Sequence, residues 1–246
     1  MLKEFKDNYN TTHGRIWAAC VLQGQGPGAN GGGTLATIIF KAKSVGRATI
    51  HLAETELLDS KMPPDQIEHT TIDGTIKVLG HDIAVLSVNP LKTIVGQGYT
   101  MQINVTVTNQ GDFTETFNVT LYANTTTIET KQVTLISGAS TIITFTWNTT
   151  GFAKGNYMVK AYALPVQGEA DTTDNTLMNG WITVTIPGDV DGDFKVKMDD
   201  IVAIRDAFGS KTGQPRYKPN LDINYDGKIS MDDIIVACDH FGWHYL

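Results

Sequence analysis

The sequence predicts a mainly β protein that ends in a small α-helical module. Three observations support this fold class. Apolar and polar residues alternate through most of the first 187 residues, as they do in strands with one buried face. After Pro187 the alternation stops, and apolar residues recur at i, i+3 and i+7, which is typical of short amphipathic helices. This C-terminal region also repeats itself along the chain, which indicates a duplicated structural unit.

Length and composition narrow the class of protein further. A chain of 246 residues with 41% hydrophobic residues is expected to form two or three globular domains. Only 18% of the residues are charged, against an average of about 25%, which excludes a disordered polyampholyte and a coiled coil. The net charge of -7 argues against a nucleic-acid partner. No apolar run approaches the roughly 20 residues that cross a bilayer, so we expect no membrane span.

The first unit, residues 1–79, is predicted to contain about four β-strands. Alternating or apolar segments at 15–22, 33–43 and 48–53 are separated by turn-forming stretches. A linker-like stretch, 79–82, follows.

Three segments of the first unit, Gly14–Trp17, Gly33–Ala42 and Asp73–Val78, carry a family resemblance. Through them the unit resembles the C-terminal part of a cohesin, whose complete jelly roll is about twice this length. It implies a partial jelly-roll domain with an exposed sheet edge. The unit is then a smaller variant, a truncated domain, or a domain that strands from another chain complete.

The second unit, residues 80–187, is predicted to be a seven-strand antiparallel β-sandwich of immunoglobulin type. Its alternation is the cleanest in the chain, as in the segment 101–107, and turn signals recur at suitable intervals. Before its last strand lies a polar loop that could hold a cation or form a solvated turn. The polar residues of this loop are Glu169, Asp171, Asp174 and Asn175.

Three segments of the second unit, Ile83–Val88, Val107–Gly111 and Glu169–Asn175, carry a family resemblance. Over about 82–187 the unit resembles the CARDB family, sandwich domains found in microbial surface and adhesion proteins. It implies a module that folds and spaces its neighbours rather than one that carries an activity.

The third unit, residues 188–246, contains a repeat of period 33. Asp189 aligns with Asp222, and the segment Met198–Ile201 aligns with Met231–Ile234. Oxygen-bearing residues stand at loop positions 1, 3, 5 and 12 of each copy, which is the spacing of an EF-hand calcium loop. Two registered copies, each followed by a helical pattern, make solvated turns and helix caps the weaker interpretation of these residues.

We therefore predict two Ca²⁺ sites, in which side chains supply positions 1, 3, 5 and 12 and a backbone carbonyl supplies position 7. The first site is expected to be weaker, because position 6 requires a positive φ and is Phe194 there. The predicted ligands are Asp189, Asp191, Asp193, Lys195 and Asp200 in the first loop and Asp222, Asn224, Asp226, Lys228 and Asp233 in the second.

A helix is predicted after each loop, at 200–208 and 233–241, with Gly209 and Gly242 as the glycines that end them. No helix is expected before the first loop, because a strand-like segment stands there. A loop and exiting helix that occur twice resemble a type I dockerin, over about 188–246.

The dockerin resemblance implies a cohesin partner. It places partner contacts at loop positions 10 and 11 and on the outer helix faces. Many family members have Ser-Thr at those loop positions, whereas this chain has Met-Asp, so a cellulosome-type specificity is not implied. Packing of the two methionines against the chain's own helices is the alternative. The residues matched to the partner surface are Met198, Asp199, Arg205, Asp206, Met231, Asp232, Cys238 and Asp239.

The compartment is predicted to be extracellular or the cell surface. Five N-x-[ST] triplets favour a secreted glycoprotein, although Thr-rich strands also produce them by chance. The polar N-terminus lacks the apolar core of a signal peptide. Cys20 and Cys238 form either a pair or two buried single thiols. The candidate glycosylation sites are Asn10, Asn104, Asn118, Asn124 and Asn148.

No catalytic motif is found, so the chain is predicted not to be an enzyme. The first hypothesis is an extracellular assembly protein, in which calcium folds the C-terminal module, the module docks a cohesin-like partner, and the sandwich acts as a spacer. The alternative is a filament or surface-layer subunit, in which the C-terminal module of one copy engages the incomplete first unit of the next.

Overall fold

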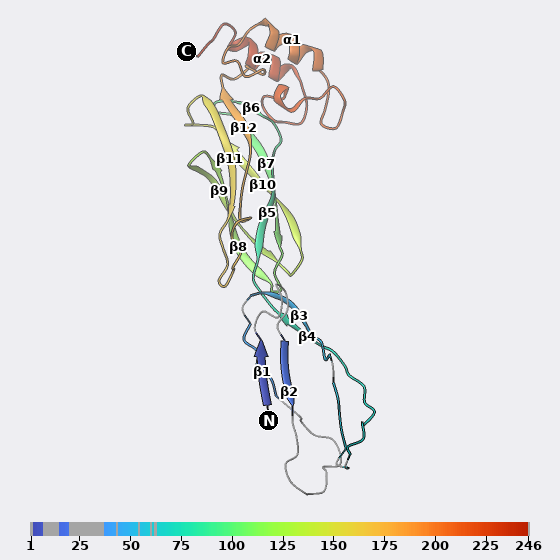
Figure 1. Cartoon of the computed structure of the whole chain (residues 1–246). Coiled ribbons are helices and arrows are strands. Elements are labelled where there is room, and N and C mark those ends of the chain that lie inside the picture. Colours follow the sequence, from blue (N-terminus) through green and yellow to red (C-terminus); the bar gives the residue numbers. More distant parts are fainter. Residues whose placement is uncertain are drawn as a thin grey trace. The chain divides into compact units, whose positions relative to one another are not determined.

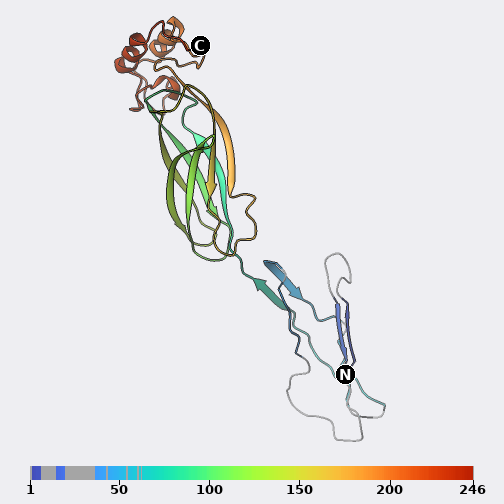
Figure 2. The same cartoon turned by 90° about the vertical axis from the view of Figure 1, so that its left-hand side faces the viewer.

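The computed structural model describes residues 2–6, 15–19, 37–42, 44–53, 55–59, 61 and 63–245. The described part of the chain is mainly β, with two short α-helices near the C-terminus (Figures 1 and 2). It divides into two compact units, Met1–Val78 and Leu79–Leu246. The second unit contains both the sandwich and the helices.

The first unit has two antiparallel strand pairs in its described part. Strand β1 (Leu2–Lys6) pairs with β2 (Arg15–Ala19), and β3 (Gly46–Ile50) pairs with β4 (Gly74–Val78). The strand expected over 33–43 is wrong for its described residues, 37–42, which form no strand. A strand requires a neighbour for its backbone hydrogen bonds, and this segment has no ladder pairing among the described residues.

Eight strands form the sandwich, which is one more than the sequence predicted. The added strand is the three-residue β6, which pairs in parallel with the end of β12. One sheet has the order β10-β7-β5 and the other β6-β12-β11-β8-β9. The strands are β5 (Ile83–Pro90), β6 (Ile94–Gly96), β7 (Thr100–Asn109), β8 (Glu115–Ala123), β9 (Thr126–Leu135), β10 (Ser140–Asn148), β11 (Gly155–Ala163) and β12 (Thr176–Thr185).

The sandwich core lies between the two sheets and follows the predicted alternation. In β7 the four residues expected on one face are fully buried, and in β10 so are Phe145 and Trp147. Burial of such side chains contributes roughly 1.5–3 kcal/mol each to folding. The four core residues of β7 are Met101, Ile103, Val105 and Val107.

The carboxylates of the polar loop before β12 accept hydrogen bonds at one end of the sandwich. The two carboxylate oxygens of Glu169 accept the N–H groups of Ile83 and Val166, both at 2.9 Å. Asp171 accepts the N–H and the hydroxyl of Thr173. These carboxylates accept N–H groups, whereas one oxygen of Asp174 and both polar side-chain atoms of Asn175 are buried without a hydrogen-bond partner in the described part of the chain, so the loop keeps both the turn and the cation interpretation.

The C-terminal module contains α1 (Met198–Ala207), the 3₁₀ turn η1 (Pro219–Leu221) and α2 (Met231–Asp239). Both α-helices begin two residues earlier than predicted. The reason is local: Asp200 and Asp233 lie inside the first turn and accept the N–H groups of Lys197 and Ser230, which precede the helices. The module core consists of Val190, Ile204, Ala207, Leu221, Ile223, Ile229 and Ala237.

Candidate metal centre

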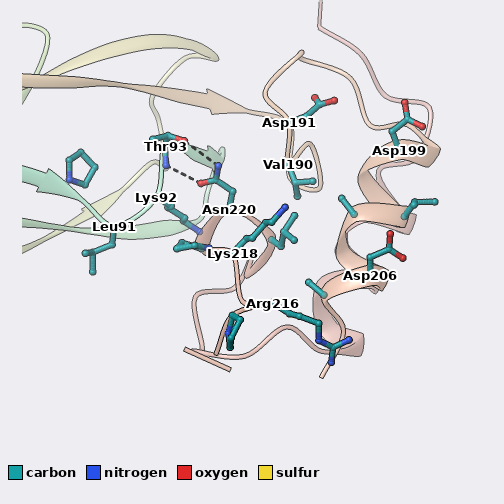
Figure 3. Close-up of a pocket in the computed structure, with 17 residues that line it drawn as sticks. Leu91, Lys92, Thr93, Val190, Asp191, Asp199, Asp206, Arg216, Lys218 and Asn220 are labelled. Carbon is teal, nitrogen blue, oxygen red and sulfur yellow. Dashed lines mark hydrogen bonds between the residues drawn. The ribbon is translucent and has the colours of Figure 1, made fainter. Parts of the chain in front are cut away.

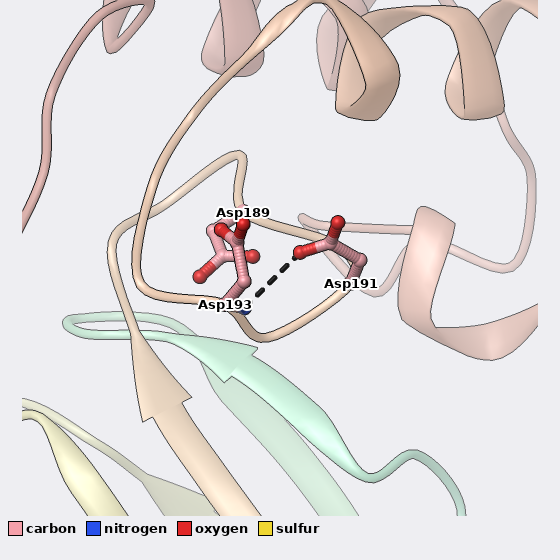
Figure 4. A group of neighbouring side chains, drawn as sticks. All are labelled: Asp189, Asp191 and Asp193. Atoms are coloured by element: carbon pink, nitrogen blue, oxygen red, sulfur yellow. Dashed lines mark hydrogen bonds between the residues drawn. The ribbon is translucent and has the colours of Figure 1, made fainter.

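The first predicted calcium loop gathers three carboxylates around one point. One oxygen each of Asp189, Asp191 and Asp193 lies within 4.8 Å of the others (Figure 4). Asp189 is buried and accepts the N–H groups of Gly192 at 2.7 Å and Phe194 at 2.8 Å. The loop is therefore wrapped around its position-1 carboxylate, with the other two carboxylates on its exposed side.

The second loop repeats this wrapping. Asp222 is fully buried and accepts the N–H groups of Asp226 at 3.1 Å and Gly227 at 2.9 Å. Position 3 is Asn224, whose side-chain oxygen accepts the N–H of Asp226 at 3.1 Å. The second loop thus offers an amide oxygen where the first offers a carboxylate, and both are hard ligands that suit Ca²⁺.

The carboxylates at position 12 close both loops. Asp200 accepts the N–H groups of Val190 and Lys197, at 2.9 and 2.8 Å. Asp233 accepts those of Ile223 and Ser230, at 2.7 and 2.8 Å. Because each carboxylate oxygen has two lone pairs, these bonds leave capacity for a cation.

Backbone conformation is also shared between the loops. Positions 4 and 6 have positive φ in both copies: 82° and 66° at Gly192 and Phe194, and 61° and 85° at Tyr225 and Gly227. Phe194 therefore adopts the left-handed conformation that the sequence identified as strained, at a cost of about 1–2 kcal/mol. Its ring packs against Tyr245, with 6.1 Å between the ring centroids.

Each loop is closed by the segment that follows the other copy's helix. The backbone of Lys195 forms an isolated antiparallel β-bridge with His244, and that of Lys228 forms one with Lys211. The tail N–H of Tyr245 donates to the Phe194 carbonyl at 2.9 Å, and the N–H of Thr212 donates to the Gly227 carbonyl at 3.0 Å. The aromatic tail thus crosses the module, which sequence reasoning left open beside docking onto a partner, whereas the reciprocal closure of the two loops was not predicted. The two closing segments, 209–212 and 242–245, share only their first glycine, so no sequence motif predicted the arrangement.

The electrostatics of the loops favour a cation. Burial raises the pKa values of the Asp189 and Asp233 carboxyls above their usual range. An ionised carboxylate with few counter-charges is costly to bury, and a bound cation offsets that cost. The donor set is entirely oxygen, which Ca²⁺ and Mg²⁺ prefer over nitrogen or sulfur. The residues of both loops therefore fit a calcium ion.

The predicted partner surface is exposed throughout, at all eight of its positions on α1 and α2. Met198 and Met231 are 58% and 55% exposed, so neither side chain is packed into the module core. Arg205 pairs with its neighbour Asp206, with 2.6 Å between nitrogen and oxygen. Cys238 is exposed, and Cys20 lies outside the described residues.

Four of the five candidate glycosylation sites lie within the sandwich, and Asn10 falls outside the described residues. Asn124 and Asn148 are exposed, whereas Asn104 and Asn118 are half-buried. The side-chain oxygen of Asn124 accepts the N–H of Met158 at 2.9 Å. Glycosylation stays a prediction.

Comparisons with known proteins identify two segments of the chain. The family model for CARDB matches residues 81–179, and the model for the dockerin type I domain matches residues 187–236. The sandwich therefore contains a segment that matches CARDB, and the C-terminal module contains one that matches a type I dockerin. No curated protein matches the chain.

Several solved structures are similar to part of the chain. The CARDB domain of a Pyrococcus furiosus protein, solved in complex with di-metal ions, is 22% identical with a TM-score of 0.38, over 45% of this chain and 99% of that one. A domain of a Methanosarcina acetivorans protein named as a cell surface protein is 25% identical with a TM-score of 0.36, over 43% and 93%. A Bifidobacterium adolescentis β-glucosidase is 21% identical with a TM-score of 0.34, over 49% and 19%.

The two matched families are non-catalytic, and they support an assembly role outside the cell or at its surface. Dockerin type I domains bind calcium and cohesin partners. Neither helix in the described part of the chain has the length and apolar character needed to cross a membrane.

Proposed function

We propose that the chain is a non-catalytic assembly protein whose C-terminal module folds around two Ca²⁺ ions and docks a cohesin-like domain of another protein. The observation that carries this proposal is the convergence of the Asp189, Asp191 and Asp193 carboxylates within 4.8 Å, in a loop that the second copy repeats. The sandwich then holds the module away from the first unit as a spacer.

The two ions would be held by the ten residues that the EF-hand spacing predicts. The side chains at positions 1, 3, 5 and 12 supply carboxylate or amide oxygens, and Lys195 and Lys228 supply backbone carbonyls. Calcium would also neutralise the module: residues 188–246 contain 11 Asp, no Glu and 7 Lys plus Arg, and two Ca²⁺ carry the charge needed to balance them.

Docking would use the exposed outer faces of α1 and α2. Each helix begins with an exposed methionine and an exposed aspartate, Met198–Asp199 and Met231–Asp232, and has another exposed aspartate near its end, Asp206 on α1 and Asp239 on α2. The expected partner surface is therefore apolar with basic residues at its rim.

Chelation tests the calcium part of this proposal. In excess EDTA the C-terminal module of the full chain should lose helical circular dichroism and melt at a lower temperature, because its buried carboxylates lose their counter-charge. Added Ca²⁺ should restore both, and Mg²⁺ at the same concentration should restore them less. Identical melting with and without EDTA would disprove calcium-dependent folding.

A filament or surface-layer subunit is the second candidate function. It is favoured by exposed apolar side chains in the described part of the first unit, among them Ile39 at 93% and Ile72 at 86% exposure. Light scattering of the purified chain distinguishes the candidates. Polymers that form only with Ca²⁺ favour the filament, whereas a calcium-loaded monomer that captures a separate cohesin favours the assembly protein.

A further inference from the structure

A lysine of the sandwich reaches into the second calcium loop. Lys92 lies between β5 and β6 and is only 3% exposed. Its Nζ donates to the backbone carbonyl of Asp222 at 3.1 Å and lies 3.5 Å from that of Ile223. The same ammonium lies 5.2 Å from the centre of the Tyr225 ring. Burial lowers the pKa of Lys92 to about 8, and Asp222 and Asp233 oppose that shift.

An asparagine forms a second connection beside Lys92 (Figure 3). The side-chain oxygen of Asn220 accepts the N–H groups of Thr93 at 3.0 Å and Ile94 at 3.3 Å. Its side-chain nitrogen donates to the Thr93 hydroxyl at 3.1 Å. Asn220 precedes the first predicted ligand of the second loop, Asp222, by two residues. The sandwich therefore contacts the chain both before the loop, at Asn220, and at its first residue, through Lys92.

Further contacts join the sandwich to the module, one of them at the first loop. Tyr99 contacts both the sandwich core and the module core. The hydroxyl of Thr185, the last residue of β12, donates to Asp189 at 2.5 Å. The sandwich and the module accordingly belong to one compact unit.

These contacts have a consequence for calcium affinity. An unsupported loop loses conformational entropy when it closes around an ion, whereas a loop already held in shape loses less, so support raises affinity. A positive charge beside the loop acts in the opposite direction, because it repels the dication. The effect of removing Lys92 on calcium binding therefore reveals which of the two influences dominates.

We propose that Lys92 is a positioning residue for the second calcium loop, and that the sandwich, through Lys92 and the Asn220 connection, raises the calcium affinity of that loop. This inference rests on the proposed calcium binding. It adds that the sandwich is part of the calcium-binding apparatus as well as a spacer.

The experiment is a calcium titration of the decalcified, ¹⁵N-labelled full chain, followed by NMR. The amides of Phe194 and Gly227 each donate to the position-1 carboxylate of their own loop, so they report the two loops separately. In Lys92→Met the midpoint for Gly227 should move to at least about tenfold higher calcium, while that for Phe194 should move less. The amides of Thr93 and Ile94 should follow Gly227 in the wild-type chain.

Lys131→Met is the matched control. The Nζ of Lys131 also donates to a backbone carbonyl, that of Thr144 at 2.7 Å, and also lies over an aromatic ring, that of Phe145 at 5.5 Å. Both contacts are within the sandwich, so this variant should leave both midpoints unchanged.

The outcomes separate the inference from the function it rests on. If neither Phe194 nor Gly227 responds to calcium in the wild-type chain, the calcium-binding function itself fails. If both respond but Lys92→Met leaves the Gly227 midpoint unchanged, lowers it, or moves both midpoints equally, the positioning role is overturned. If Lys92→Met does not fold, the same titration is made with Asn220→Ala, which removes the hydrogen bonds to Thr93 and Ile94 and keeps Lys92. The Gly227 midpoint should again move to higher calcium. An unchanged Gly227 midpoint in that variant also overturns the inference.

Discussion

At the scale of single residues, the two predicted calcium loops differ at positions 4 and 6, where a glycine and an aromatic residue change places. Phe194 and Gly227 hold equivalent places, and both have positive φ. Glycine adopts that conformation at no steric cost, whereas a side chain with a Cβ is strained there. The contact between the Phe194 and Tyr245 rings offsets part of the strain. Because Tyr225 has a positive φ at position 4 of the second loop, each loop carries one strained aromatic residue, and backbone strain alone does not rank the two sites.

Substitutions at Phe194 and Gly227 test the role of backbone strain. Phe194→Gly should tighten the first site by roughly 3–10-fold, since about 1–2 kcal/mol of strain is relieved and the ring contact is lost. Gly227→Ala should weaken the second site by about the same factor. The Cβ it adds meets only Thr212, at 3.5 Å, so conformation and not collision would be responsible. Isothermal titration calorimetry of the full chain measures both, and equal affinities in all three proteins would contradict the strain argument.

A second prediction at this scale concerns pH and the end of the sandwich. Burial, followed by repulsion from Asp174 and two further carboxylates, raises the pKa of Asp82 above its ordinary value of 3.8. The folded chain then holds this proton more tightly than the unfolded chain does. The group's contribution to stability is therefore greatest below that ordinary value and is lost as the pH rises through the folded-state pKa.

Asp82→Asn should remove this pH dependence and should stabilise the sandwich at neutral pH. One oxygen of Asp82 is buried without a hydrogen-bond partner in the described part of the chain, so the charge is uncompensated there. Thermal melting between about pH 4 and pH 7 measures the effect. Asp171→Asn is the control. Hydrogen bonds from Thr173 lower the pKa of Asp171, so this carboxylate stabilises the fold at neutral pH and its contribution is lost as the pH falls. A neutral-pH melting temperature that falls in Asp82→Asn would refute the prediction.

At the scale of elements, neither calcium loop is complete within its own repeat. The chain after α1 pairs with the second loop, and the chain after α2 pairs with the first. This exchange explains why the unit is duplicated: a single copy would leave the carbonyls and N–H groups of its loop without these partners. It also gives the aromatic tail a structural role in the first loop.

Proline substitutions in the two closing segments test this exchange. Tyr245→Pro removes the N–H that donates to the Phe194 carbonyl, and Thr212→Pro removes the one that donates to the Gly227 carbonyl. Each should weaken calcium binding in the loop that its own segment closes and not in the other. The loss of about one hydrogen bond predicts roughly 5-fold for Tyr245→Pro, and the effect should be larger for Thr212→Pro, which also removes a hydroxyl that donates to the same carbonyl at 3.2 Å. Following the Phe194 and Gly227 amides during a calcium titration separates the loops. Weakening of the same loop by both variants would contradict reciprocal closure.

At the scale of the whole molecule, charge is concentrated where the calcium loops are. Residues 188–246 account for a net charge of -4 out of the total of -7, in under a quarter of the chain. The acidic character of the protein thus belongs largely to one small module. The buried parts of that charge, Asp189, Asp200, Asp222 and Asp233, lie at positions 1 and 12 of the loops.

Sequence patterns predicted the type of structure in each region, whether strands, loops or helices. Alternation in β7 predicted its buried face, since side chains of a strand point to opposite sides and only one side meets the core. The period of 33 and the spacing of the aspartates predicted two equivalent loops, because ligands around one ion must come from fixed positions of a short turn. The sequence also identified Phe194 as anomalous, from the conformation that position 6 requires.

Tertiary structure alone decided how these parts meet. The strand expected over 33–43 was wrong in its described residues, because strand formation depends on a partner that alternation does not specify. Likewise Lys92, Asn220 and the crossing tail carry no motif, and each acts through a residue far away in the chain. Local periodicity reflects which side of an element is buried, whereas contacts between distant segments depend on how the whole chain packs. For this protein the sequence therefore predicted two loops and their candidate ligands, and the fold decided what supports those loops.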